Sequence, residues 1–172
     1  MTVISGGQTG ADRAALDAAK AAGLRTSGYA PSGYWTERGP DPSLESLGLV
    51  PGGSLAWRTE RNVVTADATI VFAVRPSPGS DMTVAMAARH GKACLVVNPW
   101  APEAETEVRQ FLDMSRPAVL NIAGHRESRA PGIYARVYGL LVSVLTRPLS
   151  SASGPEALTR VRPPGRRQRA PE

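Results

Sequence analysis

The sequence of 172 residues holds a single cysteine, two histidines and no run of 18 apolar residues. One cysteine, Cys94, cannot form a disulfide within the chain, and the lack of a long apolar run excludes a membrane-spanning helix. The two histidines, His90 and His125, do not have the spacing of a zinc-binding pair, so we expect no metal held directly by protein side chains. The first residues lack the basic and apolar segments of a secretory signal, and we therefore expect a cytoplasmic protein.

The net charge of +5 is unevenly distributed along the chain. Residues 148–172 carry five arginines and two glutamates, which leaves residues 1–147 with a net charge of only +2. The segment 148–172 is rich in Ser, Pro, Gly and Arg, and we interpret it as a flexible tail. A weak electrostatic contact of this tail with a partner is the alternative. We therefore expect one folded domain over residues 1–147 and no specific binding of nucleic acid.

Apolar, β-branched segments alternate with helical ones along residues 1–147. The predicted strands are 2–5, 25–29, 68–74, 93–98 and 118–124, and the sequences of 68–74 and 93–98 are typical of buried strands. The predicted helices are 10–22, 55–66, 80–90, 102–114 and 131–145, while 30–54 holds five Gly and four Pro and is predicted to be irregular. This alternation predicts an α/β fold: a Rossmann-like, doubly wound sheet of about five mainly parallel strands with helices on both faces.

The segment "ISGGQTGADRAAL" at 4–16 predicts a strand, a glycine-rich turn and a helix with alanines on one face. A helix N-terminus has backbone N–H groups without partners and partial positive charge, so an anion is stabilised there. Thr9 is a candidate N-cap with Asp12 three residues later. The candidate ligand-binding residues of this segment are Ser5, Gly6, Gly7, Gln8, Thr9, Gly10, Asp12 and Arg13. A tight turn that binds nothing is the alternative.

Neither common phosphate-binding signature is present in this turn. A P-loop needs Lys and then Ser or Thr after its last glycine, where this sequence has Ala11 and Asp12. A dinucleotide fingerprint needs one residue between its first two glycines, and Gly6 and Gly7 are adjacent.

Three other segments should reach the same edge of a parallel sheet. They are "RTERN" at 58–62, "RPSPGSDMT" at 75–83 and "NIAGHRES" at 121–128. Their candidate ligand-binding residues are Arg58, Asn62, Gly79, Ser80, Thr83, Asn121, Gly124, Arg126, Glu127 and Ser128. Arginines, amides and helix N-termini favour a phosphate-bearing or oxyanion ligand. A solvated helix at 58–62 and a capped loop at 125–128 are the alternatives.

With these segments on one chain, the sequence resembles the molybdenum-carrier, or molybdenum-cofactor carrier, family. The resemblance rests on "ISGGQTGADRAALDAA", "RTERNV…ADATIVF" and "LNIAGHRESRAPGIY", and it covers about residues 2–146. That family belongs to a Rossmann-like superfamily with lysine-decarboxylase-like nucleotide hydrolases. This sequence has Gly79-Ser80-Asp81 where the family usually has Gly-Gly-Thr, and Ser32 where a Lys is expected.

The resemblance implies a carrier that binds molybdenum cofactor, a pterin with a phosphate and a molybdenum oxyanion, and passes it to a molybdoenzyme. The residues alone indicate an anionic ligand with a ring. The alternatives are a nucleoside monophosphate N-glycosidase, with Asp12, Glu60 or Glu127 as its acid, and a nucleotide-sensing module. No catalytic constellation is evident: His90 reads as a surface helix cap, His125 as a structural loop residue, and Cys94 as a buried, inert thiol. The helix at 131–145 is apolar on several faces, which predicts a dimer or tetramer formed through it, and the resemblance implies an oligomer too.

Overall fold

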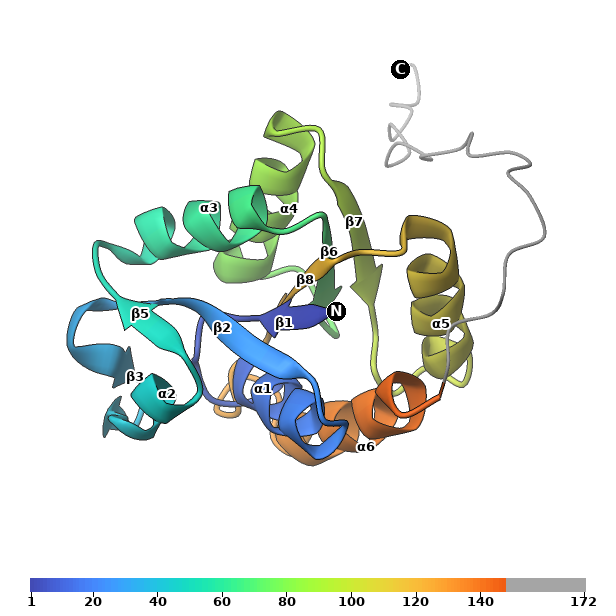
Figure 1. Cartoon of the computed structure of the whole chain (residues 1–172), viewed down its shortest axis with the longest axis horizontal. Coiled ribbons are helices and arrows are strands. Elements are labelled where there is room, and N and C mark those ends of the chain that lie inside the picture. The colour runs from blue at the N-terminus through green and yellow to red at the C-terminus, as the bar shows by residue number, and fades with distance from the viewer. Residues whose placement is uncertain (148–172) are drawn as a thin grey trace, which may run out of the picture.

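The computed structural model describes residues 1–147, so the predicted tail at 148–172 lies outside the described residues. A six-stranded sheet with the order β5-β2-β1-β8-β6-β7 forms the centre, and every neighbouring pair of strands is parallel (Figure 1). The strands are β1 (Thr2–Ile4), β2 (Arg25–Ala30), β5 (Leu49–Pro51), β6 (Ala68–Phe72), β7 (Ala93–Val97) and β8 (Val119–Gly124). This arrangement confirms the predicted α/β fold, with one strand more than expected.

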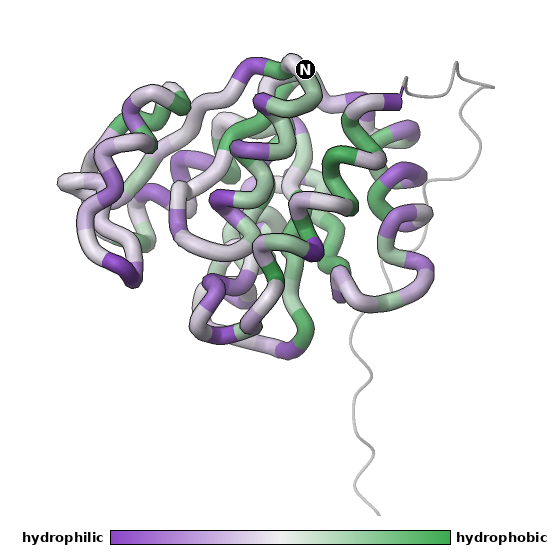
Figure 2. The backbone as a smooth tube through the Cα atoms, turned by 90° about the horizontal axis from the view of Figure 1, so that it is seen from below, coloured by the Kyte–Doolittle hydropathy of each residue, from purple (hydrophilic) through white to green (hydrophobic). Residues whose placement is uncertain are grey.

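Helices cover both faces of the sheet. α3 (Leu55–Thr65) and α4 (Pro78–Arg89) pack together on one face, while α1 (Ala11–Ala21), α5 (Ala104–Ser115) and α6 (Ile133–Leu145) cover the other (Figure 1). The alanines of α1 explain its close packing, since Ala14, Ala15 and Ala18 are fully buried against the sheet and α6. Apolar segments run through the middle of the molecule and hydrophilic turns lie outside (Figure 2). No helix of residues 1–147 is long and apolar enough to cross a membrane.

The segment 30–54 is more ordered than its glycines and prolines indicate. It forms a 3-10 turn η1 (Ser32–Tyr34), a hairpin of β3 (Trp35–Thr36) and β4 (Gly39–Pro40), a short helix α2 (Ser43–Ser46) and then β5. Leu44 and Leu49 of this segment join Leu16 of α1 in a second, smaller core. The sequence pattern missed β5 because only three residues pair, and one of them is a proline.

One prediction about an apolar segment needs correction, and a second one stays a prediction. β7 is an edge strand with Val96 50% exposed, so the prediction of a buried strand was wrong; a strand's composition does not show whether it has one neighbour or two. Five apolar residues of α6 are buried within the chain, while Tyr134, Tyr138, Val142 and Leu145 are only partly buried. Its buried residues pack against α1 and α5, and Tyr134 and Tyr138 stack on each other while the Tyr134 hydroxyl donates to Asp17. The oligomer predicted through this helix stays a prediction.

Candidate functional site

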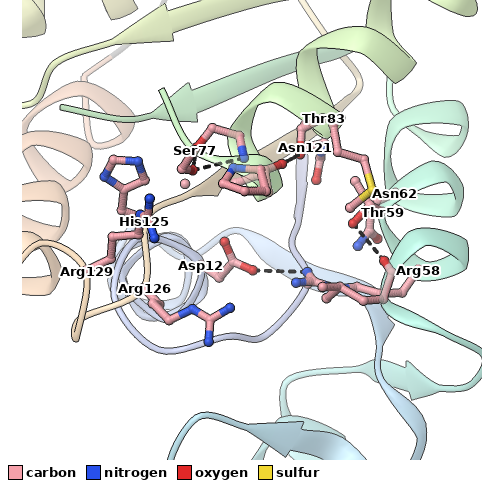
Figure 3. Close-up of a pocket in the computed structure, with 18 of the residues that line it drawn as sticks. Asp12, Arg58, Thr59, Asn62, Ser77, Thr83, Asn121, His125, Arg126 and Arg129 are labelled. Carbon is pink, nitrogen blue, oxygen red and sulfur yellow. Dashed lines mark hydrogen bonds and ion pairs between the residues drawn. The ribbon is translucent and has the colours of Figure 1, made fainter. Parts of the chain in front are cut away.

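A pocket of about 540 Å³ lies at the carboxyl ends of β1, β6 and β8, between α3, α4 and the loop 125–129 (Figure 3). Eleven of the residues that the sequence predicted for ligand binding line it: Gly6, Asp12, Arg58, Asn62, Gly79, Ser80, Thr83, Asn121, Gly124, Arg126 and Ser128. The four segments singled out in the sequence therefore meet at one sheet edge. The volume is in the range of pockets that hold small molecules.

An ion pair between Asp12 and Arg58 forms one wall of the pocket. Asp12 Oδ2 accepts a hydrogen bond from Arg58 Nη1 at 3.2 Å and from the Gln8 backbone N–H at 3.3 Å. Asp12 is only 2% exposed. Burial raises the pKa of its carboxyl above the ordinary value, and the Arg58 guanidinium works in the opposite direction. The α1 N-terminus thus already has an anion beside it, which the chain itself supplies.

The glycine-rich turn separates two sides of the molecule. A Cβ at Gly6 would lie 1.2 Å from Arg58 Nη1, so Gly6 leaves room for the arginine in the pocket. Gly7 has a φ of +73°, and a Cβ there would lie 2.8 Å from the side chains of Leu44 and Leu49. Gly7 therefore permits the turn to pack on the smaller core, and its close approach is to the protein and not to the pocket.

The remaining candidates lie away from the pocket. Gly7, Gln8, Thr9, Gly10, Arg13 and Glu127 line a second cavity of about 510 Å³ on the other side of the turn. There Arg13 binds Asp17 and Asp41 at 3.0 and 2.9 Å, which leaves its charge balanced. Ser5 lines neither cavity, because it is fully buried and its hydroxyl donates to the Ile122 carbonyl at 2.7 Å.

Thr9 does not cap α1, so that prediction was wrong. The N-cap of α1 is Gly10, without a side-chain bond, and the Thr9 hydroxyl donates instead to Glu37. Glu37 also accepts from the backbone and hydroxyl of Ser128, and Arg126 lies 3.9 Å from it. Burial opposes ionisation of Glu37, but the hydrogen bonds from Ser128 and Thr9 outweigh it and lower the pKa of this carboxyl. The β3–β4 hairpin thereby holds the loop 125–129 in place, a role that the sequence did not reveal.

Helix α3 contributes two residues one turn apart, as its sequence predicted. The Arg58 side chain is 12% exposed, and its Nε is buried without a hydrogen-bond partner among the described residues. Asn62 uses its amide to accept from the Tyr29 backbone N–H at 2.9 Å and to donate to the Tyr29 carbonyl at 3.1 Å. Asn62 therefore fixes β2 against α3, while Arg58 has donor capacity left for a ligand.

Helix α4 turns its N-terminus toward the pocket. Ser77 caps it by accepting from the Ser80 backbone N–H at 3.3 Å, and Pro78 occupies the first turn, where a proline suits a helix. A Cβ at Gly79 would meet nothing within 4 Å, so the space beside this turn is open. Asp81, the departure from the family pattern, lines a separate apolar groove with Val84. Ser32, the other departure, lies in η1 and lines neither the pocket nor the second cavity.

Two arginines of the pocket were missed in the sequence. Arg75 follows β6 and Arg129 follows β8, and the Arg75 guanidinium donates to the Arg129 carbonyl at 3.2 Å, which ties the two loops together. With Arg58 and Arg126 they bring four arginines to the lining, and Asp12 is the one carboxylate among the lining residues of 1–147. The available signal was the position of both arginines in the loops that follow the neighbouring parallel strands β6 and β8.

His125 was interpreted as a structural loop residue, but it lines the pocket. It is 2% exposed, and neither ring nitrogen has a partner within ordinary hydrogen-bond geometry among residues 1–147. Burial lowers the pKa of the ring, an effect that the Arg75 backbone partly offsets. A buried imidazole without partners carries a cost that a ligand or water would remove.

The alternative catalytic acids are dispersed. Glu60 lies outside the pocket, at the surface, 2.9 Å from His90 Nε2, and His90 is the C-cap of α4. Glu127 caps the start of α6 by accepting from the backbone N–H groups of Gly132 and Tyr134. Of the three, only Asp12 lines the pocket. Cys94 is half-buried in β7, and burial raises its pKa to about 11.

Comparisons with known proteins give a consistent result. No curated protein matches this sequence. A solved structure from Syntrophus aciditrophicus SB, named "Putative molybdenum carrier protein", is 34% identical over 85% of this chain and 94% of its own, with a TM-score of 0.77. The family model "Circularly permutated YpsA SLOG family" matches residues 3–145. Since this match spans nearly all of the described residues, the chain belongs to the circularly permuted YpsA SLOG family.

Proposed function

We propose that the protein binds an anionic, ring-bearing small molecule in the pocket between α3 and α4, and that this molecule is molybdenum cofactor. The observation that carries the proposal is the lining of four arginines against one carboxylate beside the N-terminus of α4. Such a surface attracts phosphate and oxyanion groups. The similar protein from Syntrophus aciditrophicus SB is named for molybdenum, which favours a molybdenum-bearing ligand over other anions.

The residues present fit such a ligand. Buried donors without partners, Arg58 Nε and the His125 ring, are what a ligand with several oxygens would satisfy. Leu55 and Thr59 of α3 and Met82 of α4 also line the pocket and offer uncharged side chains for a flat ring. Binding would place the phosphate or oxyanion near the arginines of the two loops and the ring toward α3. The pterin and the metal are cargo in this proposal, and the chain's own part is to hold and shield them.

A second candidate function is hydrolysis of a nucleoside monophosphate. It is favoured by Asp12 alone, a buried carboxyl in a cleft whose pKa lies above its ordinary value, as a general acid would need. Its ion pair with Arg58 argues for a structural role instead. Among residues 1–147 no other carboxylate lines the pocket to share the chemistry.

Equilibrium titration with two kinds of probe separates these functions. Wild-type protein is titrated with a pterin phosphate and with adenosine monophosphate, and each mixture is then analysed for released base by chromatography. The carrier proposal predicts tighter binding of the pterin phosphate and no turnover of either probe. Release of adenine that is lost in Asp12→Asn would establish the hydrolase. Failure of both probes to bind would contradict a site in this pocket.

We further propose that the protein is a homo-oligomer that delivers its ligand to a molybdoenzyme. The family resemblance supports the oligomer, and the molybdenum-carrier name of the similar protein supports the delivery of a ligand. Light scattering at micromolar concentration tests the first part, because a monodisperse monomer would contradict it. Transfer of labelled ligand to an apo-molybdoenzyme, faster from this protein than from free solution, tests the second.

A further inference from the structure

His125 occupies one end of the pocket, beside Ser77 and Arg129 and away from Arg58 (Figure 3). Its backbone is held on both sides: the His125 N–H donates to the Phe72 carbonyl at 2.9 Å, and its carbonyl accepts from the Ala11 N–H at 3.1 Å. The backbone position of His125 is thus set by the end of β6 and the start of α1 together. The ring makes no hydrogen bond of ordinary geometry within residues 1–147, and the Arg75 backbone engages one ring nitrogen only weakly, so at least one nitrogen is placed to contact a group that the described residues do not supply.

We propose that His125 binds an oxyanion group of the ligand directly, and that the anion draws a proton onto its ring. The inference rests on the proposed function, since it assigns this residue to the same pocket. The α4 N-terminus, with its Ser77 cap, brings further donors to this end of the pocket. An oxygen bound between the imidazole and the helix end would satisfy both.

The charged groups around the ring set its state before and after binding. Arg75 from the loop after β6 and Arg129 from the loop after β8 both disfavour a charged imidazole, and Asp81 of α4 favours it. Burial is the largest influence and lowers the pKa of the ring, so the free protein favours the neutral imidazole. Arg126 and Asp12 also line the pocket, and Asp12 is already paired with Arg58.

An anion beside the ring stabilises the protonated form and raises its pKa. The pKa is then higher in the complex than in the free protein, so binding takes up a proton and becomes weaker as the pH rises through the histidine range. One linked proton limits the effect to about tenfold in affinity for each pH unit.

Sulfate is the probe, because its charge does not change between about pH 5 and pH 8, where histidine titrates. Calorimetry in buffers of different ionisation enthalpy measures the affinity and the proton uptake together. Wild type and His90→Gln, a matched surface control, should bind with proton uptake and with falling affinity as the pH rises. His125→Gln keeps a donor but cannot titrate, so it should bind sulfate with no dependence on pH.

Nuclear magnetic resonance of the wild type gives a measurement that no variant's folding affects. The chain has two histidines, so their ring signals are distinguishable with a single histidine variant. Sulfate should raise the pKa of His125 by about one unit or more and leave His90 unchanged. An equal pH slope in His125→Gln, or an unmoved His125 pKa in sulfate-saturated protein, would overturn this inference alone. If the wild-type protein binds neither sulfate nor the pterin phosphate, both the inference about His125 and the proposed function are overturned.

Discussion

Replacing Arg58 by alanine should destabilise the protein strongly, because its largely buried side chain is paired with Asp12. The substitution leaves the Asp12 carboxylate, 2% exposed and 3.2 Å from Arg58 Nη1, without its cation. Breaking a buried pair in this way costs about 3–5 kcal/mol, because one charge stays buried without compensation. The free energy of unfolding should fall by roughly that amount at neutral pH, which corresponds to a Tm lower by roughly 6–20 °C.

The pH dependence gives a sharper test. Burial holds the folded-state pKa of Asp12 above its unfolded value, so its contribution to stability is greatest at low pH and is lost as the pH rises through the folded pKa. Without Arg58 that pKa rises further. The loss in the free energy of unfolding caused by Arg58→Ala should therefore be largest at neutral pH. It should become smaller in mild acid, where the Asp12 carboxyl takes up a proton.

Urea unfolding followed by circular dichroism measures these differences. Arg61→Ala is the matched control, since Arg61 is exposed on the same helix and lies 5.6 Å above the Trp57 ring. It should change stability by less than about 1 kcal/mol. Adding Asp12→Asn to Arg58→Ala should restore most of the loss. A loss below about 1 kcal/mol for Arg58→Ala, or one equal at both pH values, would refute the reasoning.

Three further outcomes are expected. Gly7→Val should lower the free energy of unfolding by about 1–3 kcal/mol, because the valine side chain would clash with two leucines at a residue whose φ is positive. Gly79→Ala is the control and should be as stable as the wild type, since a Cβ there meets nothing within 4 Å. Equal stability of the two variants in urea would contradict the packing role of the turn. Arg126→Ala should weaken binding of a pterin phosphate by about tenfold and Arg126→Lys by less, which titration measures, and an unchanged affinity would remove this arginine from the site. Cys94, with a pKa of about 11, should react with iodoacetamide at least roughly a hundredfold more slowly at neutral pH than free cysteine, and accelerate as the pH rises; fast labelling would contradict its burial.

Periodicity and composition predicted most of the fold. The alanine spacing of α1 predicts packing against the sheet, and the mostly apolar, β-branched residues of β6 predict a strand in the middle of the sheet; both elements are buried as expected. The edge position of β7 depends on which strand comes next to it in space, which a local pattern does not contain. The strand β5 depends likewise on pairing with β2 and on two leucines that meet α1.

The sequence predicted those residues of the site that follow the ends of the parallel strands. Residues directly after β1, β6 and β8 reached one pocket because parallel strands end at one edge. The sequence did not show that Gly6 faces the pocket while Gly7 faces the smaller core. This difference follows from the packing of Gly7 on residues 44–49, a segment that the sequence predicted to be irregular. Which loop arginines turn inward was equally hidden: Arg75 does so through a bond to the Arg129 backbone, a contact between residues 54 positions apart.

The central claim is that this pocket holds a molybdenum-bearing pterin phosphate. Protein purified from its native source, then denatured, releases whatever ligand it carried, and mass spectrometry together with elemental analysis identifies that ligand. The account predicts a pterin phosphate and molybdenum in equal amounts, both lost in parallel from Arg58→Ala/Asp12→Asn and Arg126→Ala protein. A nucleotide without molybdenum in the released fraction would contradict it.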